Sequence, residues 1–163
     1  MHVVERCSEA GVAAAFIRGE LAGRFHDEIV AGTRGWRIGG LFDGFPDDIE
    51  WHRVALSRDE VLSIRFINWD WWLTITAGSR MPTDAAARIR AGLVSGFDVE
   101  GHRPIAARQE HELIALTDSL ESPATLVEGH VRLTAYALFP ELLPAQLDVL
   151  LGVSDQASAW SEF

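Results

Sequence analysis

The fold of this chain is decided by residues 124–152, which run ATLVEGHVRLTAYALFPELLPAQLDVLLG. Residues 125–127 form a short apolar run with a β-branched residue at each end, as is typical of a buried strand. Residues 131–138 are rich in helix formers, and residues 147–151 are apolar again. With Gly129 between the first two segments, the pattern predicts a strand, a tight turn, a helix and a second strand, which together form a C-terminal βαβ unit.

The turn between the first strand and the helix has the properties of an anion-binding site. Gly129 allows the backbone to approach a ligand closely, and the first N–H groups of the following helix have no intrahelical partner. His130 and Arg132 lie in or beside the first helical turn, where a positive side chain is unfavourable unless a negative group neutralises it. We therefore expect a phosphate or carboxylate group to bind at this turn.

Glu128 ends the predicted strand, and its role is open. A carboxylate at this position can act as a general base, can hold a metal ion together with a phosphate, or can pair with Arg132. The simpler interpretation of the turn is a surface ion pair beside a histidine that caps the helix. We favour the phosphate site because the strand, glycine and helix that it requires are predicted independently.

Upstream segments predict further elements. Residues 8–30 carry apolar side chains at helical spacing behind Ser8, a candidate N-cap, and predict an amphipathic helix. Residues 31–48 mix glycines with large apolar side chains and predict a packed loop. Residues 83–93 predict another helix, whereas residues 95–108 are polar and poorly periodic and predict a loop.

Residues 61–76 predict a Trp-rich β-hairpin. Residues 61–68 and 71–76 both alternate apolar and other side chains, and Asn68-Trp69-Asp70 suggests a turn between them. The tryptophans of this segment could stack on a nucleobase, although tryptophan in alternating strands more often packs in the core or against a partner.

These segments predict one α+β domain over residues 1–163. An N-terminal helix and packed loop occupy residues 1–48, and an α/β core occupies residues 49–163, with the anion-binding turn at residues 128–132. The sequence leaves open whether the chain forms a homodimer.

Composition excludes several classes of partner. A formal net charge of −10 leaves no basic stripe for a phosphate backbone, so we expect no nucleic acid as a main partner. The single Cys7 allows neither an intramolecular disulfide nor a Cys-rich zinc site, which suits a reducing cytoplasm. The chain shows no basic and apolar leader at its start and no apolar run of about 20 residues, so we expect neither secretion nor membrane insertion.

Ser79 and Arg80 are second candidates for ligand binding. They precede the helix predicted at 83–93, and loops at the carboxyl ends of strands gather at one edge of an α/β sheet. The alternative is a capping loop with a solvated arginine. The histidines outside the turn have no metal-ligand spacing, so we predict no metal site.

The run from Thr125 to Ala135 resembles the turn of the ParB/sulfiredoxin superfamily, in which a strand ends in a Gly-containing, His/Arg-rich turn that opens a helix and contacts nucleotide phosphates. It is most similar to members with an acidic-Gly-His-x-Arg turn, including the free-serine kinases. The resemblance implies a ParB/sulfiredoxin-like mixed sheet, with phosphate contacts from Gly129, His130 and Arg132 and an acidic partner in Glu128. It covers the chain from about Gly78 onward, and within it only this turn is specific.

The chain also departs from the two best-known members of that superfamily. Sulfiredoxins place a reactive cysteine just after the turn glycine, where this chain has His130. ParB proteins carry a paired-Arg turn and a following helix-turn-helix, whereas this turn has Arg132 alone. The resemblance therefore implies neither sulfinic-acid reduction nor chromosome partition.

The expected function is that of a small-molecule phosphotransferase or nucleotide phosphohydrolase that uses a nucleotide with Mg²⁺. In that hypothesis His130 and Arg132 neutralise charge during transfer, and Glu128 acts as a base or through Mg²⁺. The alternative is a non-catalytic binding or protein-interaction module of the same fold.

Overall fold

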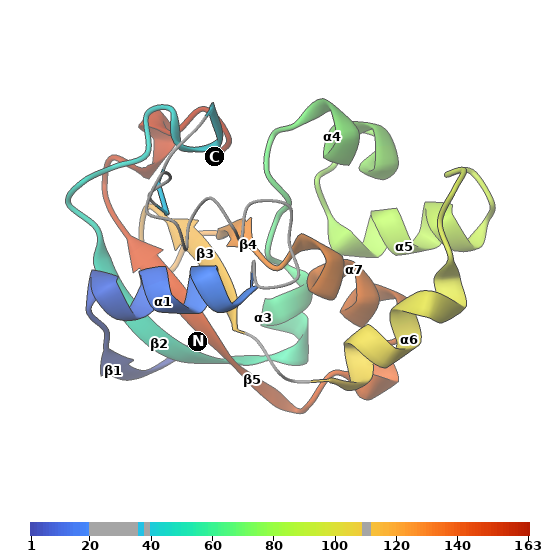
Figure 1. Cartoon of the computed structure of the whole chain (residues 1–163), viewed down its shortest axis with the longest axis horizontal. Helices are drawn as coiled ribbons and strands as arrows, with labels where there is room; N and C mark the ends of the chain where they lie inside the picture. Colours follow the sequence, from blue (N-terminus) through green and yellow to red (C-terminus); the bar gives the residue numbers. More distant parts are fainter. Residues whose placement is uncertain (20–35, 38–39, 109–111) are drawn as a thin grey trace.

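The computed structural model describes residues 1–19, 36–37, 40–108 and 112–163, and it places one five-stranded mixed sheet beside a group of helices (Figure 1). The predicted α+β class is confirmed. The strands lie in the order β1-β2-β5-β3-β4. Their bounds are β1 His2–Arg6, β2 Glu50–Ser57, β3 Leu113–Thr117, β4 Thr125–Glu128 and β5 Gln146–Val153.

Six α-helices and three 3-10 turns complete the described part of the chain. The helices are α1 Glu9–Gly19, α3 Arg58–Leu62, α4 Asp70–Thr76, α5 Pro82–Arg90, α6 Val99–Ala107 and α7 His130–Leu138. The 3-10 turns are η2 Gly40–Phe42, η3 Pro140–Leu142 and η4 Ala157–Ala159. Helices α5 and α6 both pack against α7, while α1 lies at the opposite end of the view in Figure 1.

The C-terminal segment has the predicted order of strand, helix and strand, but the predicted βαβ unit is wrong. In a βαβ unit the two strands are parallel, whereas β4 and β5 run in opposite directions, with β3 between them. All five residues of β3 are buried. Such a strand belongs inside a sheet, where both of its edges are hydrogen-bonded. It therefore takes the place beside β5 that a βαβ unit would give to β4.

The predicted Trp-rich hairpin is also wrong, because residues 70–76 form helix α4. Trp72, Ile75 and Thr76 are buried at helical spacing, whereas Trp71 is exposed. The apparent alternation of this segment therefore does not match which side chains are buried. Upstream, α3 begins with a capping box at Ser57. In place of a strand, the chain beyond α3 makes a single parallel bridge to β4 through Arg65.

The other predicted elements have mixed outcomes. Helix α1 confirms the first part of the N-terminal helix, and its residues 20–30 lie outside the described part. Helix α5 confirms the helix predicted at 83–93. The loop predicted at 95–108 is wrong, since α6 forms there with Asp98 as its N-cap, accepting from the Gly101 N–H at 3.0 Å.

An aromatic cluster closes the side of the sheet near η2. Trp36, Phe42 and Phe45 contact one another edge to face, and Phe45 also meets Trp160. Trp160 donates from Nε1 to the carbonyl of Leu41 at 2.5 Å, which fixes the C-terminal segment on the core. In the segment predicted as a packed loop, residues 31–48, Phe42 and Phe45 are buried, Asp43 and Asp47 are exposed, and residues 31–35 and 38–39 lie outside the described part. None of the described helices has both the length and the apolar content needed to cross a bilayer.

Candidate functional site

The turn at residues 128–132 joins the end of β4 to the start of α7. Gly129 is the N-cap, with φ of 103°, and no side chain caps the helix. The Gly129 carbonyl accepts the first intrahelical bond, from the Leu133 N–H at 2.8 Å. The preceding N–H groups of α7, at residues 130–132, have no partner within the helix and carry the positive end of its dipole.

Glycine is required at position 129 for two reasons. Its φ of 103° lies in the left-handed region that side chains disfavour, and a Cβ there would come within 2.4 Å of the Cδ2 atom of Leu113. Leu113 begins the buried strand β3 and is itself fully buried. The same glycine therefore lets β3 pack directly beneath the turn.

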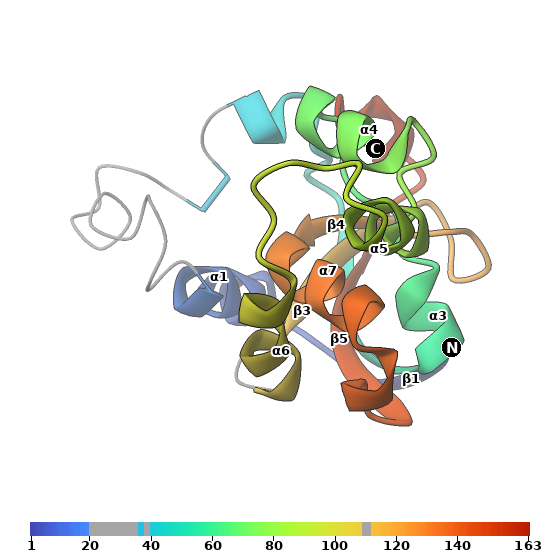
Figure 2. The ribbon, with the colours of Figure 1, turned by 90° about the vertical axis from the view of Figure 1, so that its right-hand side faces the viewer.

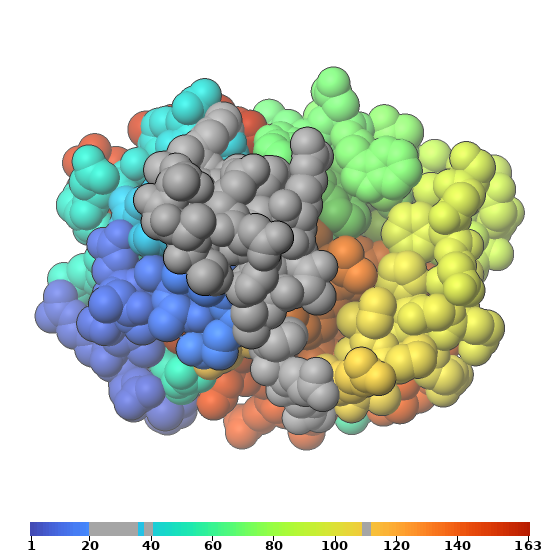
Figure 3. All heavy atoms as spheres, in the orientation of Figure 1, coloured from blue at the N-terminus to red at the C-terminus, as the bar shows by residue number. Residues whose placement is uncertain are grey.

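A cavity of about 330 Å³ lies over this turn. Residues 128–132 form one wall, and Gly19 from the end of α1 and Ile105 from α6 also line it. In Figure 3 the orange surface around α7 is set back between the yellow atoms of α6 and the green atoms above them. The turn thus faces a hollow large enough to admit a small ligand.

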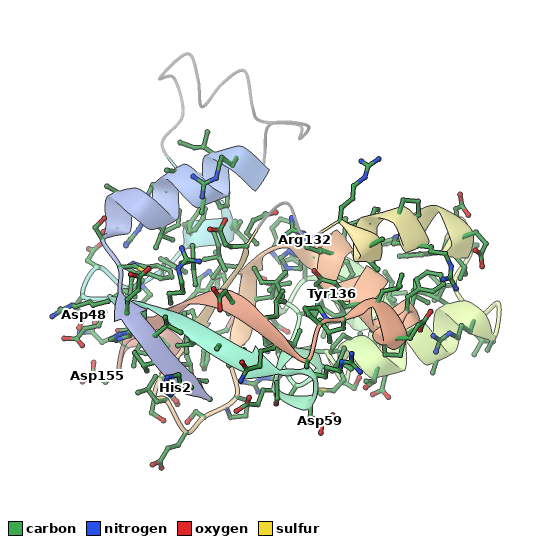
Figure 4. All side chains as sticks on the ribbon, turned by 90° about the horizontal axis from the view of Figure 1, so that it is seen from below. His2, Asp48, Asp59, Arg132, Tyr136 and Asp155 are labelled. Atoms are coloured by element: carbon green, nitrogen blue, oxygen red, sulfur yellow. The ribbon has the colours of Figure 1, made fainter. Side chains whose placement is uncertain are left out.

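Arg132 borders the cavity but is firmly held. Its Nη1 donates to the carbonyl oxygen of Glu112 at 2.9 Å. Burial lowers the pKa of the guanidinium, and the nearby Tyr136 and Glu128 oppose that shift. In Figure 4 Arg132 and Tyr136 both lie on the side of α7 that faces the sheet. The guanidinium therefore supplies a fixed positive charge beside the uncapped end of the helix.

His130 does not supply the expected positive charge. Its ring stacks on Trp72, with centroids 5.2 Å apart, and Trp72 stacks in turn on Phe66. Nε2 of the ring is buried and has no hydrogen-bond partner among the described residues, although the residue as a whole keeps some exposure. Burial lowers the pKa of His130 to about 3. The imidazole is therefore neutral near pH 7 and acts as an aromatic ring that anchors the start of α7.

Glu128 is the last residue of β4 and lines the cavity at the turn. The Oε1 atom of its carboxylate is 3.5 Å from the position that a Cβ on Gly19 would take, so α1 passes close to it. The charge of Glu128 also acts on Arg132. Of the roles left open by the sequence, electrostatic interaction with Arg132 is therefore present, and the residue is partly exposed and lines the cavity.

Ser79 and Arg80 lie away from this turn. The guanidinium of Arg80 donates to the carbonyls of Phe66, Glu162 and Phe163 and to Oγ1 of Thr125. Thr125 is the first residue of β4, whereas the turn begins at Glu128, the last residue of that strand. Ser79 Oγ donates to the Thr76 carbonyl and accepts from the Met81 N–H. Both side chains thus hold the chain between α4 and α5 to the C-terminal segment.

Sequence reasoning missed several residues of the site. Glu112 accepts from Arg132 through its carbonyl, and its carboxylate pairs with Arg18 of α1 at 3.3 Å and with Arg53 of β2 at 3.5 Å. Trp72 covers His130, and Ile105 closes the cavity from a segment predicted to be a loop. Asp98, the N-cap of α6, is the sequence signal that could have predicted this helix. The pairing of Glu112 could not be predicted in this way, because it depends on the order of the strands in the sheet.

Within the described residues, no group of three or more His, Cys, Asp and Glu side chains gathers that could hold a metal ion. Among the residues that the structure describes, Glu128 alone brings a carboxylate to the cavity at the turn. Comparison of the chain with family models, curated proteins and solved structures gave no match.

Proposed function

We propose that this chain binds a small phosphate-containing ligand, a nucleotide or another phosphate ester, at the start of α7. The observation that carries the proposal is the uncapped N-terminus of α7 opening into a cavity that Arg132 also borders. Backbone N–H groups and a fixed guanidinium are the donors that phosphate oxygens prefer. The resemblance of the turn to the ParB/sulfiredoxin superfamily, with its mixed sheet, supports the same ligand class.

A divalent cation fits this proposal. The carboxylate of Glu128 lines the same cavity and would repel a phosphate that arrived alone. Mg²⁺ commonly binds through one or two carboxylates together with the phosphates of its ligand. Glu128 is the residue that would hold it, and we therefore expect Mg²⁺ to strengthen nucleotide binding.

Binding is better supported than phosphoryl transfer. The neutral ring of His130 cannot neutralise charge that develops during transfer, which leaves that role to Arg132 and the helix amides. Glu128 is the remaining candidate for a base. We keep a small-molecule phosphotransferase or nucleotide phosphohydrolase as the catalytic form of the proposal.

Amide NMR spectra test the proposal directly. Pyrophosphate and ATP, each with and without Mg²⁺, should shift the amide signals of residues 130–132 in a saturable titration. Arg132→Met should weaken binding about tenfold, since it removes a charge-assisted hydrogen-bond donor. Arg103→Met is the matched control, because Arg103 lies on α6 and pairs with Glu100 and Glu141. Unshifted amide signals of residues 130–132 at high ligand concentration would refute the proposal. Consumption of ATP in the presence of a small hydroxy or amino acid would establish the catalytic form.

The alternative function is a non-catalytic module that binds another protein through the Trp-rich segment. Trp69 and Trp71 are 44% and 55% exposed, and with Asn68 and Asp70 they line a shallow depression. Large exposed aromatic side chains are enriched at protein interfaces. Sedimentation of the parent and of Trp69→Ser with Trp71→Ser tests whether a second copy is the partner, since the substitutions should abolish any dimer.

A further inference from the structure

A second cavity, of about 420 Å³, lies away from the α7 turn. Its walls come from β2, β5, α3, the segment after α3 and the loop between β3 and β4. Figure 2 shows α3 and the loop between β3 and β4 together on the right-hand side of the molecule. Apolar side chains form much of the lining, including Leu56, Ile64 and Leu151, which are almost fully buried. A concave apolar surface with a few polar groups is the usual form of a small-molecule site.

Arg65 is the polar group that distinguishes this cavity. Its backbone is fixed to β4, since its N–H donates to the Ala124 carbonyl and its carbonyl accepts from the Leu126 N–H, both at 2.8 Å. Arg65 lines the cavity, and its Nε atom is buried without a hydrogen-bond partner in the described ranges. The guanidinium contacts the face of the Phe163 ring, with Cζ 5.7 Å from the centroid.

The charge of Arg65 is not compensated by a carboxylate of the described chain. No ion pair joins it to any acidic side chain in those residues, and the charge of Arg65 acts on Arg80, which has the same sign. Of the two carboxylates that line the cavity, Glu60 is paired with the N-terminal ammonium group, and Glu121 is exposed. Buried charged groups are normally paired, so the buried and unpartnered Nε of Arg65 favours an anionic partner in the cavity.

We propose that this cavity binds a small monocarboxylate with an apolar body. The carboxylate would pair with the guanidinium of Arg65, and the apolar body would lie against Leu56, Ile64 and Leu151. A guanidinium holds a carboxylate through two parallel hydrogen bonds, which gives orientation as well as affinity. This site is separate from the α7 turn and takes a different class of ligand.

Three probes of equal chain length test the proposal on the unmodified protein. Octanoate, octan-1-ol and octylamine are titrated separately, and amide NMR signals locate each one. Octanoate should bind most tightly and should shift the amides of Ile64 and Leu151 rather than those of residues 130–132. Preference for octylamine, equal binding of all three, absence of octanoate binding, or shifts confined to the α7 turn would each overturn the proposal.

A pair of variants tests the role of Arg65. Arg65→Met should weaken octanoate binding about tenfold and leave octan-1-ol binding unchanged, because only the charge-assisted bonds are lost. Arg58→Met is the matched control, since Arg58 begins α3 but does not line the cavity. Equal octanoate affinity in Arg65→Met and the parent would overturn the assignment. If Arg65→Met fails to fold, the relative affinities of the parent protein for octanoate, octan-1-ol and octylamine decide whether the cavity prefers a carboxylate.

Discussion

The imidazole of His130 stacks on the indole of Trp72, with ring centroids 5.2 Å apart and an interplanar angle of 22°. The two residues come from different helices, α7 and α4, and Phe66 extends the stack beyond Trp72. A histidine at the start of a helix that also faces a cavity would ordinarily be a candidate cation. Here the stack encloses Nε2, so the residue contributes packing to the site instead of charge.

The stability of the protein should fall with acid because of His130. Its pKa is about 3 in the folded state, against 6.5 for the unperturbed side chain, so the unfolded state takes up the proton first as pH falls. Its contribution is complete above about pH 6.5 and is lost as pH falls toward 3. Between these two pH values, each unit by which the pH falls should lower the free energy of unfolding by about 1.4 kcal/mol because of His130.

Urea unfolding of the parent and of His130→Phe at several pH values measures this effect. The phenylalanine keeps an aromatic ring in the stack and removes the titrating group. The slope of stability against pH should be smaller in the variant by about one proton. Equal slopes between pH 6 and pH 4 would contradict the prediction.

Trp72 should control both the stability of the protein and the protonation of His130. Trp72→Ala removes a largely buried ring and should cost about 3–5 kcal/mol. Water should then reach the imidazole, so that the pKa of His130 rises toward 6.5, measurable by NMR titration. The adjacent Trp71→Ala is the control, since Trp71 is 55% exposed and should change stability by no more than about 0.5 kcal/mol. An unchanged His130 titration in Trp72→Ala would refute the stacking argument.

Gly129→Ala should destabilise the fold by about 2 kcal/mol or more. The new Cβ meets Leu113 at 2.4 Å and is also forced into the left-handed region at φ of 103°. Gly92→Ala separates the two causes, because Gly92 has φ of 70° but no atom within 4 Å of the added Cβ. Denaturant unfolding of both variants should give a cost of about 1 kcal/mol for Gly92→Ala and a clearly larger one for Gly129→Ala. Equal costs would show that the contact with Leu113 relaxes freely.

Arg80→Ala should destabilise the protein by about 3 kcal/mol without weakening pyrophosphate binding. It leaves three carbonyls, those of Phe66, Glu162 and Phe163, without their donor. Arg88→Ala removes a donor to a single carbonyl, that of Ile75, and should cost about 1 kcal/mol. Thermal unfolding measures the stability change, and the NMR titration measures binding. A loss of pyrophosphate affinity in folded Arg80→Ala would restore Arg80 as a ligand residue.

The sequence by itself determined the local features of the candidate site. The apolar run of β4, the required glycine at 129 and the start of α7 all follow from the sequence near the turn, because turns and helix starts depend on neighbouring residues. The α+β class followed in the same way from the alternation of strand and helix patterns. Local pattern failed at α4, where the alternation of Trp71 and its neighbours did not predict which side chains are buried.

Tertiary structure decided which residues surround the turn at 128–132 and which of its side chains carry a charge. The insertion of β3 between β4 and β5 brings the carbonyl of Glu112 to Arg132 and Leu113 to Gly129, and sequence spacing cannot predict strand order. The packing of α4 against the start of α7 buries His130 and so removes its charge, because burial disfavours the protonated imidazole. Residue type depends on the sequence alone, but the charge and the partners of a side chain depend on the segments that fold against it.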